Sequence, residues 1–210
     1  MIKQLLVKGA VLGTAALALA GLAAVASLMS GNLEFAAEQP VAAPIDTTAA
    51  LAVAQDQLAD TQSELDRAHR ILEFSGRYKI PADLASRVYD HAIDAGIPPA
   101  LGFQLVKIES GFTNSATSYA AAVGLTQLML PTARSYEPTI SAADLMNPDV
   151  NLRIGFAYLK DLLKRYDNDL PLALEAYNKG PTLVSAQMEE GIPVRGRYSN
   201  AVLRGMRKGT

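Results

Sequence analysis

The sequence contains no cysteine, no tryptophan and almost no net charge. Without cysteine the chain cannot form a disulfide framework, a thiolate nucleophile or a zinc finger, and no cysteine is present for lipidation after a leader. Its 19 Lys and Arg residues against 21 Asp and Glu residues give a net charge of −2, which provides no basic surface for nucleic acid. The histidines, His69 and His91, lack the spacing of metal ligands, so we expect no metal site.

One long run without charge lies near the start of the chain, at residues 10–29, and it follows Lys3 and Lys8. Basic residues before an apolar stretch are typical of export, and Ala24-Val25-Ala26 fits the small-x-small cleavage pattern of a signal peptide. The run is also nearly long enough to span a bilayer. The sequence therefore predicts export, with residues 1–30 either a cleaved signal peptide or an N-terminal membrane anchor.

A polar helix is expected over residues 48–75, after a linker at residues 31–47 that holds two prolines and no periodicity. Leucines recur in this helix at every seventh position, at Leu51, Leu58, Leu65 and Leu72. This spacing is typical of a short coiled coil, which would provide self-association or partner docking. Ala and Thr fill the other seam position, so a single amphipathic helix laid against the following domain is an equally good interpretation.

Residues 76–210 read as a series of short helices that form an all-α globular domain. Prolines mark the expected helix starts, at Pro81, Pro98, Pro131, Pro148 and Pro171. Glycines mark several expected ends, at Gly96, Gly111 and Gly180. No window alternates between apolar and polar residues with the period of two that strands require, so we expect no sheet.

Glu109 is the main catalytic candidate because it lies on a face that is otherwise apolar. On a helix it is stacked over Val106 and Leu105, close to the helix end at Gly111. Burial and the negative end of the helix dipole both raise the pKa of a carboxyl group. A carboxyl group that stays protonated near neutral pH can act as a general acid. Alternatively, Glu109 is a frayed C-terminal residue that points into water.

The sequence around Glu109 contains four motifs in a fixed order. They are Glu109-Ser-Gly-Phe112, Ser118-Tyr-Ala-Ala-Ala-Val-Gly-Leu-Thr-Gln-Leu-Met129, Asn147-Pro148 with Asn151-Leu-Arg-Ile-Gly155-Phe-Ala-Tyr-Leu159, and Ala176-Tyr-Asn-Lys-Gly-Pro181. In order and spacing they resemble the soluble lytic transglycosylase family, bacterial enzymes with a lysozyme-like fold that cleave peptidoglycan. The match covers about residues 100–182, with a looser tail at residues 197–202.

The resemblance implies a role for each matched position. Glu109 corresponds to the catalytic acid and base. The substrate-binding positions that it implies are Ser118, Gln127, Met129, Tyr177 and Asn178. Among these, Ser118 would orient the acid and the substrate's N-acetyl group, and the hydroxyl of Tyr177 would donate a hydrogen bond to the catalytic carboxyl. Asn151 and Gly155 share one helical face and are expected to serve structure, with Gly155 permitting close packing.

Three positions depart from the family pattern. Ala121 stands where the family prefers glycine, which would cost stability if the backbone there has a positive φ. Thr126 replaces a methionine before Gln127, and Leu130 replaces a proline after Met129. Glu109 itself is unaffected by these departures.

The resemblance also implies a mechanism with a single acid. Most glycosidases use two carboxylates, but no second acid falls on a matched catalytic position. The other acids available are Glu137, Asp144, Asp149 and Glu175. Glu109 would protonate the bond between N-acetylmuramic acid and N-acetylglucosamine and then remove a proton from the 6-hydroxyl group, which gives a 1,6-anhydro product without metal or organic cofactor. Stacking on the glycan would rest on tyrosines, with Tyr119, Tyr136, Tyr158 and Tyr198 as candidates.

Two other functions remain open at the level of sequence. One is a lysozyme-type hydrolase of peptidoglycan or chitin, which predicts a second carboxylate opposite Glu109. The other is a non-catalytic peptidoglycan-binding module, which the departures at Ala121 and Thr126 would favour. In each case the expected location is the periplasm or cell envelope, with glycan strands as the main partner.

Overall fold

The computed structural model describes residues 47–194 and 196–207. The predicted signal peptide or anchor and residues 31–46 of the predicted linker lie outside the described residues. The chain divides into two units at residues 54 and 55, and the features below belong to the second unit unless their numbers say otherwise. None of the described helices combines the length and apolar character needed to cross a membrane.

Helix α2 (Thr47–Tyr78) is longer at its C-terminal end than the sequence predicted, because it continues through Gly76. The heptad leucines are exposed, with Leu58 at 69% and Leu72 at 61%, so the alternative in which this face of the helix lies against the following domain is wrong. Ile71 and Phe74 are buried instead. The ring of Phe74 stacks on that of Phe103 with 4.2 Å between centroids, which attaches the end of α2 to the core.

Proline and glycine set most of the remaining helix boundaries, as the sequence predicted. The helices are α3 (Ala82–Asp94), α4 (Pro99–Ser110), α5 (Leu130–Arg134), α6 (Pro148–Arg165), α7 (Leu170–Lys179), α8 (Pro181–Glu189) and α9 (Arg197–Arg207), with a short 3₁₀ helix η2 (Asp144–Met146) before α6. Gly111 ends α4 with φ +58°, a left-handed conformation that glycine adopts at low cost. Asn147 caps α6 by accepting hydrogen bonds from the N–H groups of Asp149 and Val150.

Two short strands lie between α4 and α5, so the prediction that no sheet forms is wrong in this segment. Strand β1 (Ala122–Val123) pairs antiparallel with β2 (Leu128–Met129), with Ala122 opposite Met129 and Val123 opposite Leu128. Two residues are too few to show a period of two, which explains why the sequence pattern gave no signal. Apart from an isolated bridge between Thr117 and Val123, the other regular elements among the described residues are helices.

The backbone at Ala121, just before β1, has φ +62°. An L-residue with a side chain is strained in this left-handed region, and Ala121 is exposed, so its methyl group gains little from packing. We expect Ala121→Gly to stabilise the protein by about 1 kcal/mol, measured as a shift of the urea unfolding midpoint. The control is Ala120→Gly, an exposed neighbour without positive φ, which should destabilise. Equal destabilisation by both variants would contradict strain at Ala121.

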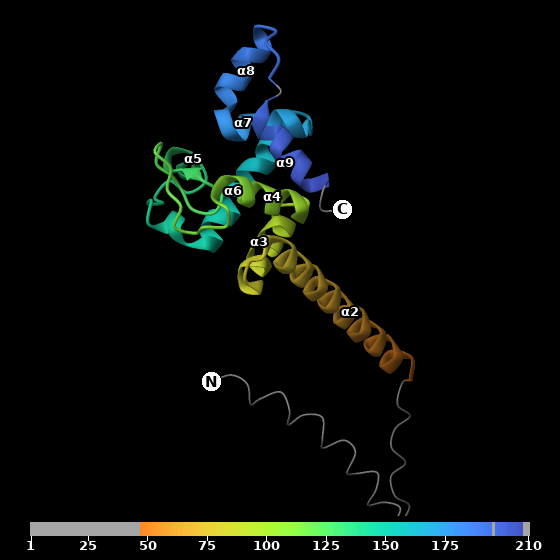
Figure 1. Cartoon of the computed structure of the whole chain (residues 1–210). Coiled ribbons are helices and arrows are strands. Elements are labelled where there is room, and N and C mark those ends of the chain that lie inside the picture. The colour runs from red at the N-terminus through yellow and green to blue at the C-terminus, as the bar shows by residue number, and fades with distance from the viewer. Residues whose placement is uncertain (1–46, 195, 208–210) are drawn as a thin grey trace, which may run out of the picture. The chain divides into compact units, whose positions relative to one another are not determined.

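Helix α6 is at the centre of the unit. It packs against α3 and against α7, while α4 packs against α3 and α9. Figure 1 shows the strands and α5 on one side of α6, and α7, α8 and α9 together on another. A large hydrophobic cluster joins the end of α2 to α3, α4, α6, α7 and α9, and a smaller one lies under the hairpin and includes Val123, Leu128, Ala133, Ile140, Leu145 and Ile154.

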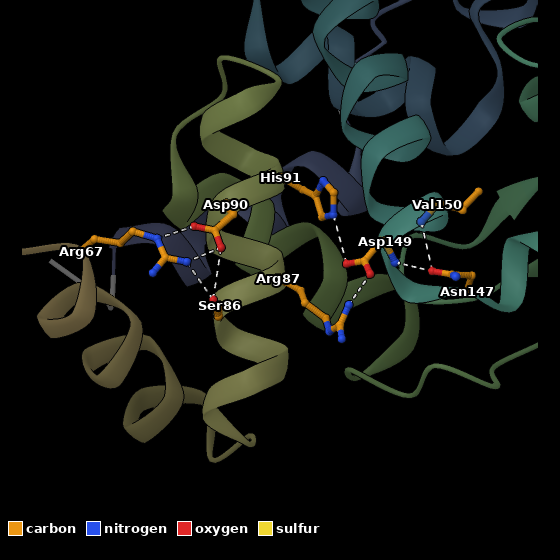
Figure 2. A network of polar contacts seen from close by, with 8 residues as sticks. All are labelled: Arg67, Ser86, Arg87, Asp90, His91, Asn147, Asp149 and Val150. Atoms are coloured by element: carbon orange, nitrogen blue, oxygen red, sulfur yellow. Dashed lines mark hydrogen bonds and ion pairs between the residues drawn. The ribbon is translucent and has the colours of Figure 1, made fainter. Parts of the chain in front are cut away.

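A network of charged groups joins α2, α3 and the start of α6 (Figure 2). Arg67 on α2 forms an ion pair with Asp90 on α3 and donates to Ser86 at 3.0 Å. Arg87 and His91, also on α3, both contact the carboxylate of Asp149 in the first turn of α6. The hydrogen bond from Arg87, helped by His91, holds the pKa of Asp149 below its ordinary value. These contacts connect α2 and α6 to α3, the helix against which α4 packs.

Candidate active site

Glu109 lies in the last turn of α4, on the apolar face that the sequence predicted. Leu105 and Val106, one turn earlier, are fully buried, and Glu109 itself is partly buried. Burial raises the pKa of the Glu109 carboxyl from 4.5 to about 7. A carboxyl group with this pKa is protonated in a large fraction of molecules at neutral pH, as a general acid requires.

The hydroxyl of Tyr198, on α9, donates a hydrogen bond to Oε1 of Glu109. This bond favours the charged form and so partly offsets the effect of burial on the pKa of Glu109. Burial and the negative charge of Glu109 raise the pKa of Tyr198 far above its ordinary value, so the phenol keeps its proton and remains a donor. The carboxyl of Glu109 on α4 is thus hydrogen-bonded by a residue of α9, a helix that is distant from α4 in sequence.

Three side chains hold the loop that follows β1, and one of them is Ser110, the neighbour of Glu109. The hydroxyl of Ser110 lies 2.8 Å from the carbonyl oxygen of Leu125, and the hydroxyl of Tyr177 donates to the carbonyl oxygen of Thr126 at 3.0 Å. The buried amide of Asn151 accepts from the N–H and the hydroxyl of Thr126, both at 2.8 Å. The loop that leads to Gln127 is therefore tied to α4, α6 and α7.

Thr126 fits this loop because it lies against Gly155 on α6. A Cβ atom at residue 155 would lie 2.3 Å from Oγ1 of Thr126, closer than any real contact allows. The glycine thus permits the close packing that the sequence predicted, and the hydroxyl of Thr126 is satisfied by Asn151. The hydroxyl that Thr126 introduces therefore has a hydrogen-bond partner in the interior.

A pocket of about 300 Å³ lies between the hairpin and the end of α7. Its lining includes four of the predicted substrate-binding residues, Gln127, Met129, Tyr177 and Asn178. The backbone at Gln127 has φ +48°, a strained conformation, and its side-chain amide holds it by donating to the carbonyl oxygens of Ala116 and Gly124 at 3.1 Å. Tyr158 also lines the pocket, and its ring packs against that of Tyr177 at 5.2 Å between centroids.

Ser118 lies in the turn before β1. Its hydroxyl oxygen accepts a hydrogen bond from the N–H of Ala122 at 3.1 Å. As an acceptor in this bond the hydroxyl keeps its own proton for donation. The role of Ser118 toward the N-acetyl group of a substrate stays a prediction.

Comparison with known proteins identifies the domain that contains this site. Residues 90–191 match the family model described as the transglycosylase SLT domain. This chain contains an SLT domain. The matched range includes Glu109 and the whole hairpin region, and the resemblance predicted from the four motifs is confirmed. Tyr198 lies just beyond the end of the matched range.

Two solved structures resemble the fold around the SLT domain. One is an inactive mutant of lytic transglycosylase Slt from Pseudomonas aeruginosa, with 29% identity over 59% of this chain and a TM-score of 0.53. The other is the 70 kDa soluble lytic transglycosylase from Escherichia coli, with 25% identity over 65% of this chain and a TM-score of 0.54. The aligned region covers 23% and 25% of those proteins, so this chain matches about a quarter of their length.

The partner of Glu109 in the SLT domain differs from the one that the sequence predicted. The resemblance assigned the hydrogen bond to Tyr177, whose hydroxyl instead donates to the backbone of Thr126. Tyr198 donates to Glu109 in its place. The sequence placed Tyr198 only among residues that could stack on a glycan, because its motif, in the tail at residues 197–202, is the weakest of the match.

The remaining tyrosines and acids separate into those at the site and those elsewhere. Tyr119 is fully exposed, and Tyr136 donates to Asp161 at 2.8 Å. The other candidate acids all have partners other than Glu109: the ion pair Glu137–Arg153, the turn Ser141–Asp144, the pairs of Asp149 with Arg87 and His91, and the contacts of Glu175 with Lys179 and the N–H of Ser199. Within residues 47–194 and 196–207, no group of three or more histidine or acidic side chains is arranged to hold a metal ion.

Proposed function

We propose that the SLT domain is a peptidoglycan lytic transglycosylase that cleaves the bond between N-acetylmuramic acid and N-acetylglucosamine. The observation that carries this proposal is Glu109, a partly buried carboxyl group with a pKa of about 7 beside the hydroxyl of Tyr198. The family match supports the same reaction class. The Pseudomonas aeruginosa structure adds support, since its inactive form carries a glutamate-to-glutamine mutation.

In the first step the protonated Glu109 donates its proton to the glycosidic oxygen. The bond to the leaving sugar breaks as positive charge develops on the muramic acid ring, and the substrate's own acetamido group stabilises that charge. In the second step the glutamate, now ionised, removes the proton of the 6-hydroxyl group, whose oxygen closes the 1,6-anhydro ring. Glu109 ends the cycle protonated, and no water is consumed.

The partners of the other acids favour this route over hydrolysis with two carboxylates. An inverting or retaining glycosidase needs a second carboxylate across the scissile bond from the acid. Glu137, Asp144 and Asp149 are each committed to a surface ion pair or turn, and Glu175 is held by Lys179. In the proposed route the acetamido group of the substrate replaces the missing carboxylate.

The pocket beside the hairpin supplies the proposed contacts with the glycan. Gln127 offers its amide oxygen and Asn178 its amide group, Met129 is exposed for apolar contact, and the rings of Tyr158 and Tyr177 form an aromatic wall. Ser118, with a free proton on its hydroxyl, would donate to the acetamido carbonyl. Because peptidoglycan lies outside the cytoplasmic membrane, the proposal also implies export to the cell envelope, for which residues 1–30 are the proposed signal or anchor.

Removing the hydroxyl that donates to Glu109 should move the pH dependence of the reaction. In Tyr198→Phe the carboxylate loses a stabilising hydrogen bond, so the pKa of Glu109 rises and the decline of kcat/KM at alkaline pH moves to higher pH. The maximal rate should fall by about tenfold, because a hydrogen bond of about 1.5 kcal/mol no longer holds the carboxyl group in place. The measurement is the pH profile of glycan release.

The matched control for this substitution is Tyr119→Phe, since Tyr119 is fully exposed. Its pH profile should coincide with that of the wild type. A Tyr198→Phe profile that declines at the same or lower pH than the wild type would contradict the role given to this hydroxyl.

The direct test of the proposed function is digestion of purified peptidoglycan by the full chain. Mass spectrometry of the released fragments should find muropeptides lighter by one water than the corresponding hydrolysis products. Fragments with ordinary reducing ends would show a hydrolase. Binding to the sacculus without release of fragments would show a glycan-binding module.

A further inference from the structure

One buried carboxylate in the domain has no part in the proposed reaction. The side chain of Glu175, on α7, is only 1% exposed. Its Oε2 lies 2.8 Å from Nζ of Lys179, one turn later, and its Oε1 accepts a hydrogen bond from the backbone N–H of Ser199 at 2.9 Å. Burial raises the pKa of Glu175, but the ion pair with Lys179 and the hydrogen bond from Ser199 outweigh burial and hold it below the ordinary value. A charged group in such a place requires an explanation.

The position of this carboxylate is at the start of α9. The first N–H groups of a helix have no partner within the helix, and that end carries partial positive charge. Ser199 is the third residue of α9, so Glu175 accepts one of these N–H groups from a different helix. The Glu175 carboxylate therefore stabilises the N-terminus of α9 in the position where the Ser199 N–H reaches it.

The fit between Glu175 and α9 is close. A Cβ atom at residue 196 would lie 2.7 Å and 2.8 Å from the two carboxylate oxygens of Glu175, so only glycine leaves room for the carboxylate there. Gly196 thus permits the close approach of the Glu175 carboxylate.

Glu175 contacts α9, which is also the helix that carries Tyr198, the hydrogen-bond donor to Glu109. Tyr198 is the residue directly before Ser199, and its hydroxyl donates to Glu109. A shift of the first turn of α9 would move this hydroxyl relative to α4. The chain of contacts therefore runs from Lys179 through Glu175 and the Ser199 N–H to Tyr198 and Glu109.

We propose that Glu175 is a positioning residue for the catalytic acid, acting through the N-terminus of α9 and the hydroxyl of Tyr198. The inference rests on the proposed function for its consequence in catalysis, but its structural claim concerns Glu109 in the free protein. It predicts that disturbing Glu175 changes the titration of Glu109 in the same way as removing the Tyr198 hydroxyl.

The test is an NMR titration of the Glu109 side-chain carboxyl in the full chain labelled with carbon-13. Glu175→Ala removes the acceptor, and Gly196→Ala keeps both charges of the Glu175–Lys179 pair but displaces the carboxylate. We expect both variants to titrate Glu109 at higher pH than the wild type, as Tyr198→Phe does. Glu175→Gln, which keeps an oxygen acceptor for the Ser199 N–H, should return the titration toward the wild-type position. Glu190→Gln, at an exposed site, is the control and should have no effect.

A double variant separates positioning from a direct effect of charge. In the Tyr198→Phe background, Glu175→Ala should cause no further shift, because the hydroxyl that it positions is already gone. The same shift in both backgrounds would overturn the proposal, as would an unchanged or lower titration of Glu109 in Gly196→Ala. If Glu175→Ala fails to fold, Gly196→Ala decides the question.

Measuring the release of fragments in addition to the titration distinguishes a failure of this inference from a failure of the proposed function. If the wild type releases anhydro fragments and Gly196→Ala gives a wild-type pH profile, the positioning role is wrong and the function stands. If the wild type releases no fragments, the proposed function is wrong, and the titration still decides whether Glu175 positions the carboxyl of Glu109.

Discussion

Glu109→Gln should lose about a thousandfold or more of the lytic activity while the protein stays folded. Glutamine has nearly the same shape but can neither donate the proton to the glycosidic oxygen nor accept the proton of the 6-hydroxyl group. A positioned acid or base contributes about 10²- to 10⁴-fold to a rate, and one residue serves both steps here. The measurement is the initial rate of fragment release from peptidoglycan, with sacculus binding measured in parallel.

The stability of Glu109→Gln shows whether the variant is folded, and the direction in which its stability differs from that of the wild type can be predicted at each pH. The native state holds the proton on Glu109 up to about pH 7, whereas the unfolded state releases it near pH 4.5. Wild-type stability therefore falls as pH rises through this window, because ionisation of the buried group is unfavourable. At pH 8 the variant should be more stable than the wild type by up to about 3 kcal/mol, and at pH 4 the two should be equally stable.

A lytic activity of Glu109→Gln within tenfold of that of the wild type would contradict the catalytic role of Glu109.

Asn151→Ala should destabilise the domain by about 4 kcal/mol or more. Asn151 is fully buried, and besides the two bonds that it accepts from Thr126 its amide donates to the carbonyl oxygens of Val123 and Leu145 at 2.9 and 3.1 Å. Alanine would leave these backbone groups without partners in the interior, at a cost of about 1–3 kcal/mol for each group. Against a total stability of about 5–15 kcal/mol, this loss is large. Urea unfolding followed by circular dichroism measures it.

The matched control for Asn151→Ala is Asn147→Ala in the same helix. Asn147 is exposed and caps α6, so its loss should cost only about 1 kcal/mol. If the two substitutions cost the same, the buried network around Thr126 does not hold the hairpin as the contacts indicate.

Local signals explain why most helix boundaries were predictable from the sequence. A proline in the first turn and a glycine at the end act through the backbone of their own residues, so they work without knowledge of the tertiary structure. The position of Glu109 on an apolar face was predictable for the same reason, since residues three and four apart share a helix face. The raised pKa follows from that position.

Features that depend on distant contacts were not predictable in this way. The donor to Glu109 is 89 positions away in sequence, and two tyrosines, Tyr177 and Tyr198, could each supply a hydroxyl. Which of them reaches the acid depends on how α7 and α9 pack against α4. The exposed leucines of α2 show the same limit, because a heptad pattern identifies a seam but not the partner that covers it. Self-association through that seam stays a prediction.

The most direct test of the one-acid reaction is digestion of peptidoglycan in water enriched in oxygen-18. In the proposed route the new bond at the anomeric carbon comes from the sugar's own 6-hydroxyl oxygen, so the released fragments should carry no label at that carbon. A hydrolase would place one oxygen of the solvent there. Unlabelled anhydro fragments, absent with Glu109→Gln, are the predicted result; fragments that carry the heavy oxygen at their new ends would contradict it.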